Sequence, residues 1–123
     1  MTKKDPVREF LLHRGCPPHV VDGGLEGLLR AWEKTAAEVA RGYRLGLDDY
    51  LNDADGRELL DAALAAAAAD RDAFRPRLEA ADRMIQRHLQ PAGPCLWGED
   101  EARSHGWKPE RNWWYFRRPR GLD

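Results

Sequence analysis

Apolar residues recur at helical spacing in several separate segments of this 123-residue chain. The clearest series starts at Leu25 and Leu28 and runs to Tyr43, forming a continuous stripe along one side of a long helix. Proline and glycine separate the segments, and this confines each helix to a definite range. The main helices are predicted over residues 6–14, 24–41, 56–69 and 72–89. We therefore expect an all-α single domain, built as a bundle of three to four helices.

Capping residues refine these boundaries. Asp5 followed by Pro6 is typical of a helix start. Asp48 or Asp49 is expected to cap a short helix that holds Tyr50 and Leu51, and Asp55 to cap the next one. Pro76 is expected in the first turn of the last long helix, where its missing N–H costs little. The predicted core consists of Phe10, Leu28, Trp32, Val39, Leu59, Phe74, Leu78 and Ile85.

The C-terminal quarter differs in kind from the rest. Four of the five tryptophans lie between Trp97 and Trp114, and aromatic and basic residues crowd the run 112–119. A large aromatic side chain buries roughly 150–250 Å², so we expect residues 96–118 to be ordered on the helices. Residues 113–117 have strand-like composition, but no second such segment offers a partner. The predicted organisation is a helical core over residues 1–90 with a partly extended wrap over 91–123.

Composition narrows the class of protein. The net charge is −1, with 33% charged and 42% hydrophobic residues, as in a soluble globular domain without a field that attracts nucleic acid or membrane. The apolar run 62–69 is too short to span a membrane, and no secretory signal is visible, so a cytoplasmic location is expected. Sixteen arginines against four lysines, with abundant alanine, suggest a bacterial source. Cys16 and Cys95 are expected to be reduced.

Two groups of residues have the chemistry of metal ligands. His13, Cys16 and His19 are suitable types for zinc, with Cys95, His88 or His105 as a fourth ligand, but their spacing is unlike that of zinc sites. Asp49, Asn52 and Asp53 share one helical face and could hold Mg²⁺ or Mn²⁺. Ordinary structural roles explain both groups better. We expect no cofactor.

The aromatic and basic tail is the preferred binding surface. In an extended stretch Trp113 and Tyr115 face one way, and Trp114 and Phe116 the other, so that one set can be buried while the other stays outside. The alternative is that the rings serve only the core. The acidic segment 48–61 is expected to face the basic tail. The candidate partner-binding residues are Trp107, Trp113, Trp114, Tyr115, Phe116, Arg117, Arg118, Asp49 and Asp53.

Three functions remain open on this basis. The first is a small non-catalytic interaction or regulatory protein that binds a protein partner, or a second copy of itself, through the tail. The alternative is a module that binds single-stranded nucleic acid, because bases stack on aromatic rings while arginines contact phosphates. The third is a metal-dependent enzyme that uses one of the two ligand groups.

Overall fold

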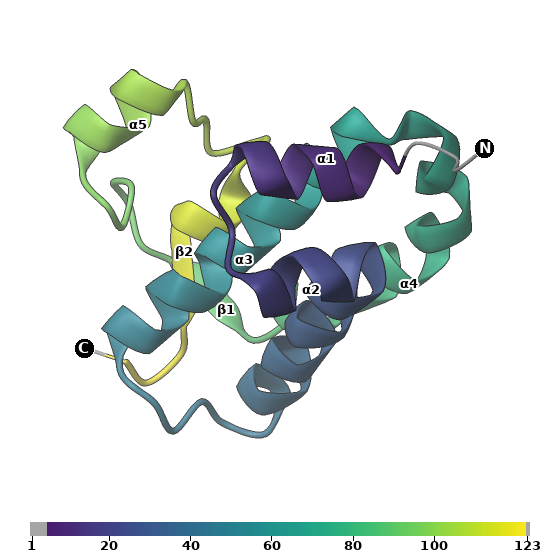
Figure 1. Cartoon of the computed structure of the whole chain (residues 1–123). Helices are drawn as coiled ribbons and strands as arrows, with labels where there is room; N and C mark the ends of the chain where they lie inside the picture. Colours follow the sequence, from purple (N-terminus) through teal and green to yellow (C-terminus); the bar gives the residue numbers. More distant parts are fainter. Residues whose placement is uncertain (1–4, 123) are drawn as a thin grey trace.

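The computed structural model describes residues 5–122 and confirms the all-α prediction (Figure 1). Helices α1 to α4 form the bundle, and a small two-stranded sheet, a short helix and a 3₁₀ turn follow. The helices are α1 (Pro6–His13), α2 (Pro18–Ala40), α3 (Leu47–Ala66), α4 (Ala68–Gln86) and α5 (Glu99–His105). None of the helices in this part of the chain combines the length and apolar character that crossing a bilayer requires.

Helix α1 begins as predicted, and α2 begins six residues earlier than predicted. The Asp5 carboxylate accepts a hydrogen bond from the backbone N–H of Arg8 at 3.1 Å. Helix α2 starts at Pro18, whose fixed φ suits the first helical position. Gly24 interrupts the helical geometry of α2, with φ 59° and ψ −153°. The predicted start at residue 24 is therefore a kink inside a longer helix.

Helix α3 corrects the predicted division of residues 48–69 into two helices. It is continuous over 20 residues, so Asp55 lies inside the helix and is not an N-cap. Asp49 lies in the first turn, where its side chain accepts a hydrogen bond from the backbone N–H of Gly46 at 3.0 Å. Asp48 is exposed in the same turn, where a negative charge favours the helix dipole. Burial of Tyr50 and Ala54 in the same core cluster as Leu60 explains why the two predicted pieces join.

Helix α4 begins at Ala68, four residues before the predicted start. Ala67, with φ −127° and ψ 59°, separates it from α3. Pro76 consequently lies within α4 and not in its first turn. Its position is exposed, so water can satisfy the carbonyl group that the missing N–H leaves without a donor.

Helix α2 packs against both α3 and α4, and α1 crosses α2 and α3 (Figure 1). Four of the predicted core residues are buried, namely Leu28, Trp32, Val39 and Ile85. The other four are partly buried and pack against the core from its edge, namely Phe10, Leu59, Phe74 and Leu78.

The C-terminal segment corrects the prediction of an unpaired extended tail. Strand β1 (Leu89–Pro91) pairs antiparallel with β2 (Arg117–Pro119), with Gln90 opposite Arg118. The partner strand was predicted as a helix end, because three residues are too few to show an alternating pattern. Just before β2, residues Trp113–Tyr115 form the 3₁₀ helix η1. The turn places Trp114 and Tyr115 both in the core, at 1% exposure each, so the predicted alternation of rings is wrong.

Candidate functional site

Trp114 anchors the C-terminal segment to the bundle. Its ring lies 4.3 Å from the guanidinium carbon of Arg57 and meets the ring of Trp113 edge-on at 5.4 Å. The hydroxyl of Tyr50 in α3 donates a hydrogen bond to the backbone carbonyl of Trp114 at 3.1 Å. A cation facing an indole ring and a buried hydrogen bond to its backbone hold this residue at a defined place.

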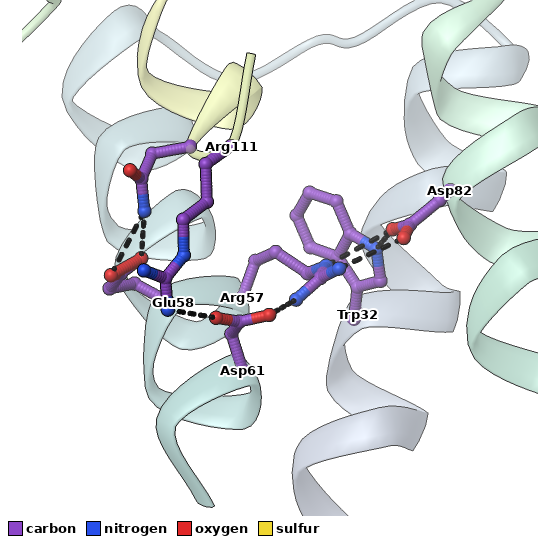
Figure 2. Close-up of polar contacts among 7 residues, drawn as sticks. Trp32, Arg57, Glu58, Asp61, Asp82 and Arg111 are labelled. Carbon is purple, nitrogen blue, oxygen red and sulfur yellow. Dashed lines mark hydrogen bonds and ion pairs between the residues drawn. The ribbon is translucent and has the colours of Figure 1, made fainter. Parts of the chain in front are cut away.

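Arg57, whose guanidinium faces the Trp114 ring, takes part in contacts that join three helices. Figure 2 shows Arg57 between Asp61 and Asp82. The Arg57 Nε and Nη2 donate to the two carboxylate oxygens of Asp82 in α4, at 3.1 and 2.9 Å. The indole N–H of Trp32 in α2 donates to the same carboxylate at 2.8 Å. On its other side Arg57 lies 3.6 Å from Asp61. The planar, bidentate pair of Arg57 with Asp82 fixes the orientation of the guanidinium against which Trp114 packs.

A second set of contacts joins α3 to the segment that precedes η1. The amide of Asn112 donates to both carboxylate oxygens of Glu58, at 3.2 and 3.1 Å. Arg111 lies 4.0 Å from Asp61, beside Glu58 (Figure 2). Burial raises the pKa of the Glu58 carboxyl, and the hydrogen bond from Asn112 opposes that shift only in part. The acidic segment and the tail therefore do meet, at the middle of α3.

Three rings form a stack next to these contacts. Trp107 lies between Tyr115 and His105, with ring centres 4.1 and 4.5 Å away. The Tyr115 hydroxyl donates to Oδ1 of Asp55 at 2.6 Å, and burial together with that bond raises the pKa of Tyr115 far above its usual range. The indole N–H of Trp97 donates to the same oxygen at 3.0 Å. Asp55 thus holds two aromatic side chains from separate parts of the chain.

The stack forms one wall of a cavity of about 730 Å³, which we call the aromatic pocket. Helices α1, α3 and α5 and the segment around Tyr115 surround it. Its aromatic lining comprises Trp97, His105, Trp107 and Tyr115. Its charged lining comprises Asp55, Glu58, Glu101 and Arg14. A volume of this size, with several rings and a few polar groups, is typical of a ligand site.

Helix α5 forms the outer side of the pocket and projects away from the bundle (Figure 1). Gly98 and Gly106 flank it, with φ values of 103° and 71° that suit glycine. No residue of α5 is buried. Trp107, which follows the helix, lines both the aromatic pocket and a smaller cavity of about 330 Å³ on its other side. The α5 segment is attached through the stacked Trp107 ring and through Ala102, which packs against the edge of the core.

The structure separates the predicted partner-binding residues into different environments. Trp114 and Tyr115 are buried, whereas Trp107, Trp113 and Phe116 are half-buried. The pocket also contains residues outside the predicted partner-binding set, namely Trp97, Asp55, Glu58, Glu101 and His105. The sequence held a signal for three of them, because Asp55 and Glu58 lie in the acidic segment expected to face the tail and Trp97 lies in the aromatic-rich quarter.

The acidic segment meets the tail through residues other than Arg117 and Arg118, the two arginines in the predicted partner-binding set. Across the described residues, no ion pair involves Arg117 or Arg118, and the pair that links the two regions is Arg111 with Asp61. Asp53 is half-buried and accepts a hydrogen bond from the Tyr43 hydroxyl at 2.7 Å. Burial raises the pKa of Asp53.

The candidate metal ligands are not assembled into a site. Within residues 5–122, no three side chains of His, Cys, Asp or Glu are grouped so that they could hold a metal ion. This applies to His13, Cys16 and His19. In the other group, Asp49 accepts a hydrogen bond from the backbone N–H of Gly46 and Asp53 accepts one from the Tyr43 hydroxyl. Cys16 is half-buried and Cys95 is buried, and neither forms a disulfide.

No protein-family model matches the chain, and comparisons with curated proteins and with solved structures found no match. The geometry of the aromatic pocket is therefore the basis for a functional hypothesis.

Proposed function

We propose that this protein is a non-catalytic binding protein that docks a protein partner at the aromatic pocket. The observation that carries the proposal is Trp97. Trp97 is 41% exposed, yet its indole N–H donates a hydrogen bond to Asp55, and both residues line the cavity. A large ring that is both positioned and accessible is typical of the residues that dominate protein interfaces.

The pocket residues favour binding over catalysis. Both oxygens of Glu58 accept hydrogen bonds from Asn112, and Oδ1 of Asp55 accepts bonds from Trp97 and Tyr115. Carboxylate oxygens that accept hydrogen bonds from neighbouring side chains support the shape of the site. Each of these carboxylates thus has a structural role that needs no proton transfer.

The nucleic-acid alternative has weaker support. Three carboxylates, those of Asp55, Glu58 and Glu101, line the cavity beside the rings. They would repel the phosphates of a strand whose bases stacked there. The exposed Arg117 lies outside that lining.

Capture from an extract of the source organism tests the proposal when paired with point variants. We expect immobilised protein to retain a specific partner, and Trp97→Ala to reduce the retained amount at least about tenfold, a typical effect for a hot-spot residue. Leu45→Ala is the matched control, since Leu45 is 49% exposed and lies in the connector between α2 and α3. Equal capture by Trp97→Ala and the unchanged protein would contradict the proposal.

Two further measurements distinguish the alternatives. Sedimentation of the purified protein over a range of concentrations reveals whether the partner is a second copy. Quenching of tryptophan fluorescence by oligothymidylate, lost with added salt, would support nucleic-acid binding instead.

A further inference from the structure

We infer that the aromatic pocket binds an arginine side chain of the partner. This inference rests on the proposed function, since it names the chemistry of the group that the pocket recognises. It starts from the cavity itself, whose volume of about 730 Å³ leaves room for a long side chain and the backbone on either side of it.

The charges around the cavity favour a cation. Asp55, Glu58 and Glu101 line it, against a single guanidinium, that of Arg14. The Arg14 guanidinium carbon lies 5.5 Å from the ring centre of Phe10, on the α1 side. Glu101 also lies 3.2 Å from Nε2 of His105, which lines the same cavity. Three carboxylates against one guanidinium and one imidazole still leave an excess of negative charge that a positive ligand group would balance.

One carboxylate oxygen of the lining is available. Oδ1 of Asp55 accepts both aromatic donors, and the hydrogen bonds of the described residues give Oδ2 no donor. Trp97 is held through Oδ1, so its ring and the open oxygen Oδ2 belong to one fixed unit. A guanidinium can donate to a carboxylate and stack on an indole ring at once, because it is planar and carries its donors at its edge.

These features distinguish arginine from lysine. An ammonium group is a compact, strongly hydrated charge without a planar face, so it cannot stack on Trp97 while it donates to Asp55. The stack of His105, Trp107 and Tyr115 offers apolar surface for the aliphatic part of the side chain.

Titration with blocked tripeptides tests the inference directly. The probes are acetyl-Gly-Arg-Gly-amide and the same peptide with citrulline, which keeps the shape of arginine without its charge. With ¹⁵N-labelled protein, we expect the arginine peptide to shift the indole N–H resonance of Trp97 in a saturable way. The citrulline and lysine peptides should bind at least about fivefold more weakly, a difference of the size expected for one charge-assisted contact.

Variants locate the binding to the pocket. Glu101→Gln should weaken the arginine peptide severalfold, and the amide spectrum checks that the ring stack is kept, because Glu101 also lies 3.2 Å from His105 of that stack. Asp55→Asn should weaken it further, and its folding is checked by the amide spectrum because Asp55 also supports Tyr115. Asp48→Asn, an exposed carboxylate in the first turn of α3, is the matched control and should bind as the unchanged protein does.

The outcomes separate this inference from the proposed function. Equal binding of the arginine and citrulline peptides, equal binding of the lysine peptide, or no shift at Trp97 would overturn the inference. If Trp97→Ala still abolished partner capture, the proposed function would stand without it. A third outcome is saturable arginine binding with equal partner capture by Trp97→Ala and the unchanged protein. It would contradict the proposed function and leave the arginine site in place.

Discussion

Arg57 and Trp114 are 57 residues apart in sequence, yet the guanidinium carbon of one lies 4.3 Å from the ring centre of the other. The same guanidinium makes a bidentate pair with Asp82, so one side chain joins α3 to α4 and supports the C-terminal segment. The side chain of Arg57 is 6% exposed, and that of Asp82 is 18% exposed.

Replacing Arg57 with methionine is expected to lower the free energy of unfolding by roughly 3 kcal/mol, because it leaves Asp82 mostly buried without its partner. Urea denaturation measures the change. The double variant with Asp82→Asn should cost less than the sum of the two single changes, since the unpaired charge is then gone. Arg75→Ala is the control, because the pair of Arg75 with Asp72 is exposed and should contribute under about 1 kcal/mol. A single-variant loss no larger than that of the control would contradict the structural role.

A chain that ends at residue 93 should no longer unfold cooperatively near the transition of the full chain. It loses β2, the partner of β1, together with the buried Trp114 and Tyr115. Loss of one buried tryptophan alone costs roughly 3–5 kcal/mol, a large share of the stability of a small domain. Thermal denaturation followed by circular dichroism checks this, with Trp114→Ala as the milder version and Leu12→Ala, which is exposed on α1, as the control. An unchanged Tm in the truncated chain would mean that the tail contributes little to folding.

The kink in α2 predicts opposite effects for two nearby glycines. Gly24 has φ 59° and ψ −153°, a conformation that side chains other than glycine adopt only with strain. Gly24→Ala should therefore destabilise the protein by about 1–3 kcal/mol. Gly27 lies in regular helix, and a Cβ added there would meet open space. Gly27→Ala should therefore raise the free energy of unfolding by about 0.5–1 kcal/mol. Chemical denaturation of both variants measures the contrast, and equal effects of the same sign would refute the kink.

Glu58 predicts a pH dependence of stability. Burial raises its pKa in the folded state, so the folded protein holds this proton more tightly than the unfolded chain does. The stabilising contribution is complete below the unfolded pKa, near 4.5, and is lost as the pH rises through the folded value. We expect Glu58→Gln to be at least as stable as the unchanged protein at pH 7, and its advantage to shrink as the pH falls towards 4.5.

The quantity to follow is the difference in the free energy of unfolding between Glu58→Gln and the unchanged protein. Glu33 acts in the opposite direction, because its hydrogen bond with Arg77 lowers its pKa, but it is common to both proteins and cancels. Unfolding free energies from urea at several pH values give the curve. An advantage of Glu58→Gln that grows on acidification would contradict the direction assigned to the Glu58 pKa.

Local patterns were enough to predict the class of fold and much of the core. The spacing from Leu25 to Tyr43 marks a helix because one face must be apolar to pack, and the buried Trp32 and Val39 follow from it. Predicted boundaries were less accurate where tertiary packing overrode local signals. The sequence predicts Asp55 as a helix cap. In the structure the helix continues past Asp55, because Tyr50 and Leu60 on either side of it are both buried in the core.

The sequence by itself therefore determined that the chain forms helices, and that a tail with so many large rings packs against them. Only the tertiary structure decided which rings enter the core, which strand pairs with β2, and that Asp55 meets both Trp97 and Tyr115. The physical reason is the separation in sequence of the residues that interact. Helical periodicity is encoded within a few neighbouring residues, whereas a pocket depends on groups 42 and 60 positions apart that meet only after the bundle has formed.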